Sequence, residues 1–227
     1  MESTDDVALT RCILGVITTA DGLILTAAHV VQGAEELTVV FPDGEQVKGK
    51  VLGANYSKDI AMVKIEKGGP WPFVAMGSSK PLEAGDWVIA LGHSAGFDAA
   101  RTPPVRFGRV VSKGPGNFLT TDCTLIGGDS GGPLFDLEGR IIGINSSIGV
   151  SLTNNNHAGI DGFRQDWDRL LAGEAWGQLQ MNPFANPEMP VLGIGALLII
   201  VRTLMQVRFT AEWWRRYAFA IYLATVG

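Results

Sequence analysis

Three side chains of this sequence have the types and spacing that nucleophilic catalysis needs. His29 follows a short apolar run, Asp59 opens a strand-like run, and Ser130 lies in the string GDSGGP. A serine hydroxyl becomes a nucleophile when a histidine accepts its proton and an acid orients that histidine. We therefore predict that His29, Asp59 and Ser130 form a catalytic triad.

The glycines beside Ser130 predict a pocket for the negative oxygen that forms when a carbonyl is attacked. We expect the backbone N–H groups of Gly128 and Ser130 to donate to that oxygen, since glycine allows a turn too tight for a Cβ. Each residue alone has a plainer interpretation. His29 could be a polar core residue, Asp59 a turn residue and GDSGGP a glycine loop. The three together, in this order, favour catalysis.

These stretches resemble trypsin-like serine proteases, and within that group the bacterial Deg/HtrA branch. The order histidine, acid, serine is that of chymotrypsin-type double barrels, and the matching stretches are 20–31, 58–64, 85–92 and 121–143. The resemblance covers about residues 12–172. It implies an all-β fold with two six-stranded-type antiparallel barrels and a C-terminal helix. It also implies a serine endopeptidase that acts on polypeptide substrates.

Short apolar runs separated by Asp-Gly and Glu-Gly turns agree with an all-β body. For a first barrel at about 12–70, we expect strands at 13–19, 23–26, 36–41, 45–52 and 60–65. For a second barrel at about 82–160, we expect strands at 87–92, 105–112, 118–122, 133–135, 140–144 and near 157–160. The spacing of apolar residues predicts a packing helix at 163–171.

The first barrel could be incomplete, because the family has a further strand ahead of the one at 13–19. Either residues 7–10 supply that strand, or the chain starts inside a longer protein. Residues 1–15 have neither a basic start nor an apolar core, so no signal peptide is visible.

The resemblance also places the residues that bind substrate. Thr124, Leu125 and Ile126 occupy the pocket region where trypsin carries an acid, so a basic substrate side chain would lack a partner there. We expect cleavage after small or medium apolar residues. A second set lies on one strand and is expected to pair with the substrate backbone: Ile144, Asn145, Ser146 and Ser147. Within it, Ser146 is expected to donate to Asp59. Ordinary strand serines are the alternative for Ser146 and Ser147.

Two departures from the family pattern stand out. The Deg branch usually has asparagine where this chain has Asp129, and in trypsins an aspartate here pairs with an amino terminus made by cleavage. No Ile-Val-Gly-Gly activation sequence lies upstream, so the partner of Asp129 stays open and a poorly formed oxyanion pocket is conceivable. The PDZ domain that Deg proteins usually carry after the protease is also missing.

Composition agrees with one sizeable core or two small barrels, since 46% of the 227 residues are hydrophobic and 29 are glycine. Two cysteines, Cys12 and Cys123, cannot form a disulfide scaffold, and we expect separate buried thiols, as in a bacterial enzyme. Neither a cofactor nor a metal is predicted.

The last part of the chain differs from the rest. Residues 190–227 contain four arginines and one glutamate, a net +3, which leaves −8 for the remainder of a chain with net charge −5. The acidic body argues against nucleic acid as a partner. We expect a protease domain at 1–172, a linker at 173–190 and an apolar membrane tail at 191–227, with the protease on the periplasmic or outer side. A surface helix and a helix packed on the protease are the alternatives.

Three classes of function remain open. The first is a membrane-tethered serine endopeptidase of protein quality control or regulated proteolysis. The second is a peptide-binding or chaperone module with weak or no activity, against which the intact triad argues. The third is a sensory peptide-binding ectodomain. The sequence leaves the oligomeric state open.

Overall fold

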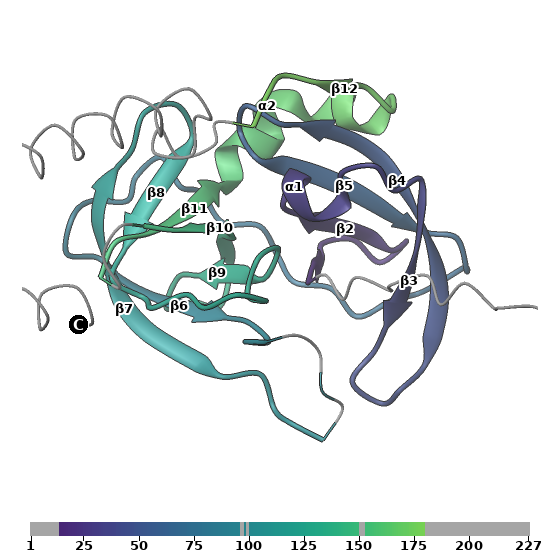
Figure 1. Ribbon diagram of the computed structural model, residues 1–227, viewed down its shortest axis with the longest axis horizontal. Helices are drawn as coiled ribbons and strands as arrows, with labels where there is room; N and C mark the ends of the chain where they lie inside the picture. The colour runs from purple at the N-terminus through teal and green to yellow at the C-terminus, as the bar shows by residue number, and fades with distance from the viewer. Residues whose placement is uncertain (1–13, 96–97, 99, 150–152, 180–227) are drawn as a thin grey trace, which may run out of the picture. The chain divides into compact units, whose positions relative to one another are not determined.

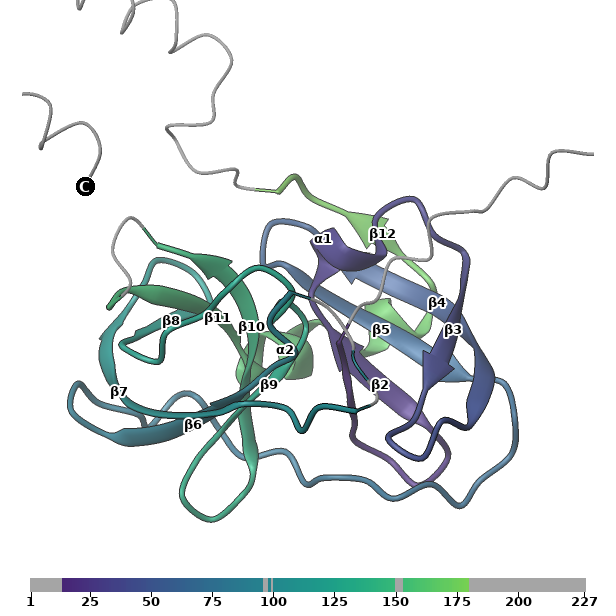
Figure 2. The same cartoon turned by 60° about the horizontal axis from the view of Figure 1, so that its bottom comes forward.

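The structure is a computed structural model that describes residues 14–95, 98, 100–149 and 153–179. Its strands form a closed barrel and a separate six-stranded sheet, which lie side by side in Figures 1 and 2. This architecture confirms the predicted all-β class. Residues 1–13, with the possible strand at 7–10 and Cys12, and the predicted tail at 191–227 lie outside the described residues.

The first sheet has the strand order β1-β2-β5-β4-β12, and β3 pairs with β4. Its strands are β1 (Val16–Ile17), β2 (Leu23–Thr26), β3 (Glu36–Val40), β4 (Gln46–Asn55), β5 (Ile60–Ile65) and β12 (Ala175–Trp176). Strand β1 is shorter than the predicted 13–19. In the described part of the chain β1 has no pairing with β3, so these strands form an open sheet and not a closed barrel.

The sheet is the first unit of the fold, and the second unit is a closed barrel with the strand order β10-β11-β8-β7-β6-β9. Its strands are β6 (Trp87–Leu91), β7 (Val105–Lys113), β8 (Phe118–Thr121), β9 (Pro133–Phe135), β10 (Ile141–Ile148) and β11 (Asn155–Gly159). Each contains a predicted strand or most of one. Strand β10 runs on beyond Ile144, the last residue that pairs with β9.

Two helices complete the described part of the chain. The four-residue α1 (Ala28–Val31) follows β2, and α2 (Ile160–Leu171) follows β11. Helix α2 begins three residues before its predicted start, because Ile160 is buried and extends the apolar face formed by Phe163 and Leu170. Neither helix is long and apolar enough to cross a bilayer.

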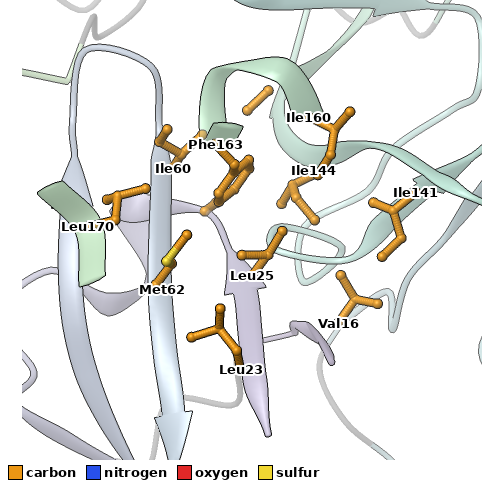
Figure 3. Close-up of a cluster of buried hydrophobic side chains, with 12 residues drawn as sticks. Val16, Leu23, Leu25, Ile60, Met62, Ile141, Ile144, Ile160, Phe163 and Leu170 are labelled. Carbon is orange, nitrogen blue, oxygen red and sulfur yellow. The ribbon is translucent and has the colours of Figure 1, made fainter. Parts of the chain in front are cut away.

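One buried cluster joins the two units to α2 (Figure 3). Leu25 and Met62 come from the sheet, Ile144 from the barrel, and Phe163 and Leu170 from the helix. Each fully buried apolar side chain of this size contributes about 1.5–3 kcal/mol relative to exposure. The shared core therefore holds the sheet and the barrel in one fixed arrangement, on which any site between them depends.

Candidate active site

The three predicted catalytic residues come from both units. His29 lies on α1, Asp59 ends the turn between β4 and β5, and Ser130 lies in the loop before β9. The first two therefore belong to the sheet and the third to the barrel. Only the packing of the two units on each other can bring all three together.

His29 and Asp59 form a close pair. The Nδ1 atom of His29 lies 3.0 and 2.9 Å from the two carboxylate oxygens of Asp59, and the His29 backbone N–H donates to Oδ1 at 2.9 Å. Asp59 is 5% exposed. A carboxylate that accepts from both the ring and the backbone of one histidine holds the ring orientation and favours a proton on Nδ1. The Nε2 atom is then left as the base.

Hydrogen bonds of the Asn55 side chain hold the turn that carries Asp59. The Asn55 side-chain oxygen accepts from the backbone N–H groups of Ser57 and Lys58 at 3.0 and 3.4 Å, and its Nδ2 donates to Asp166 of α2 at 2.7 Å. Asp59 has a positive φ of 53°, in the left-handed region that aspartate tolerates better than most residues. Asn55 therefore connects the acid's turn to the helix.

Ser146 of β10 contacts both the acid and the nucleophile. Its Oγ donates to Asp59 Oδ2 at 2.5 Å, and its carbonyl oxygen accepts from Ser130 Oγ at 3.3 Å. No hydrogen bond joins Ser130 to His29 within the described residues; catalytic hydrogen bonds are often long without substrate. The structure thus gathers the predicted catalytic residues around one strand residue.

Two glycines shape the loop around Ser130. Gly128 has a φ of +101° and Gly131 a φ of +87°, and a Cβ on Gly131 would collide with the Leu14 carbonyl and the Thr26 hydroxyl. The Gly131 N–H donates to the Asn145 carbonyl at 2.8 Å. The N–H groups of Gly128 and Ser130, the predicted oxyanion donors, donate to no group in the described part of the chain.

The Asp129 side chain has a charged partner, which could not be identified from the sequence. Asp129 is 1% exposed, and its Oδ2 lies 2.9 Å from Nη2 of Arg106 on β7. The Ile126 backbone N–H and the Ser94 hydroxyl also donate to it, at 2.7 and 3.2 Å. In the sequence, this pairing was indicated only by the acid at position 129, because a buried carboxylate requires a cation or several hydrogen-bond donors. Arg106 had no motif of its own.

The residues predicted to bind substrate divide into two groups. Leu125 packs in the barrel core, and Ile144 and Asn145 are fully buried. These three side chains cannot contact a substrate, because each is buried inside the protein. Ile126 is 50% exposed, Thr124 and Ser146 are at least half-buried, and Ser147 is exposed.

Asn145 instead supports the nucleophile loop from the barrel interior. Its Nδ2 donates to the carbonyls of Leu91 and Asp129 at 2.8 and 3.1 Å. Its oxygen lies 3.0 Å from His157 Nδ1, and His157 Nε2 lies 2.8 Å from Thr121 Oγ1. Burial lowers the pKa of His157 to about 3, so this histidine is neutral at pH 7 and orients Asn145.

The family described as the trypsin-like peptidase domain matches residues 14–144, the stretch that contains His29, Asp59 and Ser130. This chain belongs to the trypsin-like peptidase domain family. The resemblance stated from the sequence motifs is thereby confirmed.

Curated relatives of this trypsin-like domain are bacterial proteins, as predicted. Two of them are named "Probable periplasmic serine endoprotease DegP-like". The protein from Ectopseudomonas mendocina (strain ymp) is 41% identical over 141 residues, which cover 59% of this chain and 29% of the relative. The protein from Halomonas elongata is 39% identical over 139 residues, with the same two shares. The chain thus spans less than a third of the length of these relatives.

A solved structure described as "HtrA-type protease AlgW with decapeptide" resembles this trypsin-like domain in three dimensions. The TM-score is 0.61 and the sequence identity 25%, over 70% of this chain and 52% of the other. The fold and the Deg/HtrA resemblance therefore agree.

Proposed function

We propose that this domain is a serine endopeptidase that uses Ser130 as nucleophile, His29 as base and Asp59 as the orienting acid. The observation that carries the proposal is the contact of Asp59 with both His29 and Ser146, while Ser146 contacts Ser130. The family match and the relatives named serine endoproteases support it.

The reaction follows from these positions. Ser130 Oγ attacks the carbonyl carbon of the scissile peptide bond while His29 Nε2 accepts its proton. The N–H groups of Gly128 and Ser130 bind the negative oxygen of the tetrahedral intermediate. The intermediate collapses when His29 returns the proton to the leaving amine, which leaves an acyl group on Ser130. Water, deprotonated by His29, then releases the acid and restores the serine.

An extended peptide fits the strand edge beside this site. Strand β10 extends past its last pairing with β9, so Ser146–Ile148 present one edge without a β9 partner. A substrate strand could pair there through its backbone, which gives affinity without sequence demands. A mainly apolar hollow of about 530 Å³ next to Gly128 offers room for the residues after the scissile bond. The solved relative with a decapeptide supports polypeptide as the substrate class.

Peptide hydrolysis tests this proposal. Ser130→Ala should abolish cleavage of unfolded casein, and His29→Ala should lower kcat by about three or more powers of ten, because the triad acts as a unit. The matched control is Ser112→Ala, which removes an exposed serine on β7 and should retain full activity. Casein cleavage by Ser130→Ala at the wild-type rate would refute the assignment.

We also propose that residues 191–207 tether the protein to a membrane. This stretch is mostly apolar, with Arg202, Thr203 and Gln206 as its polar residues, and the following 208–216 holds arginines and two tryptophans that suit a headgroup layer. The relatives named periplasmic support a protease domain outside the cytoplasm.

A further inference from the structure

The Asp129 carboxylate is a charge with no access to water. It lies between Gly128 and Ser130 in the chain, the two residues whose N–H groups we assign to the oxyanion pocket, and it is 1% exposed. A buried carboxylate is strongly unfavourable unless a cation and hydrogen-bond donors compensate it. The groups that compensate Asp129 therefore also hold the loop on either side of it.

Those groups come from three places. The Ile126 N–H is part of the same loop, Ser94 lies just after β6, and Arg106 lies on β7. Arg106 Nη2 lies 2.9 Å from the carboxylate, and the same nitrogen donates to Ser94 Oγ at 2.5 Å. The Arg106 side chain is itself only 13% exposed. One guanidinium thus anchors both the carboxylate and the hydroxyl that supports it.

The neighbouring chain is shaped around the same carboxylate. A Cβ on Gly92, directly after β6, would collide with Asp129 Oδ1, so only glycine leaves room for it. The Ala95 N–H donates to the Gly127 carbonyl at 2.6 Å. Residues 92–95, directly after β6, therefore pack on the nucleophile loop at two points, of which one is the carboxylate.

We propose that Arg106 is a positioning residue that sets the oxyanion pocket by holding Asp129. The inference rests on the proposed serine-peptidase function and extends it. The charge partner is a side chain of the intact chain, so the loop reaches its working shape without an amino terminus made by cleavage. Arg106 acts through Asp129 and does not contact the substrate.

The test compares wild type, Arg106→Met and the double variant Arg106→Met with Asp129→Asn, each as the full uncleaved chain. Arg106→Met leaves the carboxylate buried without a cation, and we expect kcat to fall about 100-fold with little change in KM, as when an oxyanion donor is lost. Asp129→Asn on the Arg106→Met background removes the unpaired charge. The double variant should therefore be more active than Arg106→Met alone. Arg140→Met, which removes the exposed Arg140 from its pair with the buried Asp136, is the control and should keep wild-type kcat.

Rates are expressed per folded molecule, with the folded fraction taken from thermal unfolding of each variant. A purely structural ion pair would lower the melting temperature and leave kcat per folded molecule unchanged, and that result would overturn the inference. So would a double variant no more active than Arg106→Met. If wild type itself fails to cleave peptides or to react with a fluorophosphonate, the proposed function fails instead, so the two failures are distinct.

Discussion

Ser146 shows how much of the site depends on single contacts. Its hydroxyl contacts the acid at 2.5 Å and its carbonyl contacts the nucleophile at 3.3 Å. The predicted contact between Ser146 and Asp59 is therefore present. A hydrogen bond to a charged, buried carboxylate is among the stronger ones in proteins, at about 1.5–3 kcal/mol. One strand residue thus keeps the sheet's acid aligned with the barrel's serine.

We expect single side chains to decide the substrate preference as well. Ile126 is half-exposed and apolar, and the neighbouring Thr124 carries no charge. Peptides with Val, Ala or Leu before the scissile bond should be cut faster than matched peptides with Arg or Lys, because a buried cation there would be unpaired. Comparing kcat/KM across such a series measures this. Faster cleavage after Arg would show that an acid elsewhere lines the pocket.

His157 makes stability depend on pH. Burial lowers its pKa to about 3, against an ordinary value of 6.5. The unfolded chain therefore binds more protons between these values, so the contribution of His157 is complete above pH 6.5 and is lost as pH falls toward 3. His157→Gln, which cannot titrate, should show a shallower decline in unfolding free energy between pH 7 and pH 4. Urea unfolding across this range is the measurement, and an unchanged slope would contradict the account.

At the scale of elements, β12 supports the turn that carries Asp59. The Ala54 N–H donates to the Glu174 carbonyl at 2.9 Å, and the Tyr56 N–H donates to the Trp176 carbonyl at 2.8 Å. Both acceptors lie after the predicted domain end at residue 172. The segment from 173 to 179, predicted as the start of a linker, therefore supplies a strand to the first sheet.

Truncation tests this role of β12. A chain ending at Gly173 should unfold at a lower temperature than a chain ending at Leu179, because it lacks about two net hydrogen bonds of about 1 kcal/mol each. Its reaction with a serine probe should also be slower, since the Asp59 turn loses its support. Scanning calorimetry and labelling rates give both readouts. Equal melting temperatures would mean that β12 contributes nothing to the sheet.

Most strands were predictable because their apolar residues alternate or run together between glycine turns, as in 60–65 and 133–135. Helix α1 was not predictable, because four residues are too few to show a helical periodicity. Strand β12 was not predictable either, because a two-residue strand is defined only by the strand that it pairs with. The close approach of His29 to Asp59 was predictable from motifs. The pairing of Arg106 with Asp129 was not, because it depends on the barrel's register, in which Arg106 lies opposite Ala90.

At the scale of the molecule, the described domain has a single core that runs through the sheet, the barrel and α2. The residues of this core, with the side chains packed against it, lie between Val16 and Trp176. We therefore expect the protease domain to fold when the tail is removed, and to keep its site.

The tail should decide where the protein is found. The full chain should remain with membranes after carbonate extraction, because residues 191–207 are mostly apolar and would satisfy their own backbone groups as a helix. A chain ending at Leu179 should stay in the supernatant. Release of the full chain by carbonate or high salt would indicate surface adsorption only.

The central claim is that Ser130 is an activated nucleophile, and a covalent probe tests it most directly. The native protein is treated with a fluorophosphonate, digested and analysed by mass spectrometry to locate the adduct. We predict one adduct, on Ser130, whose rate of formation falls by several powers of ten in His29→Ala. An adduct absent from Ser130 in folded wild type, or formed there equally fast in His29→Ala, would contradict it.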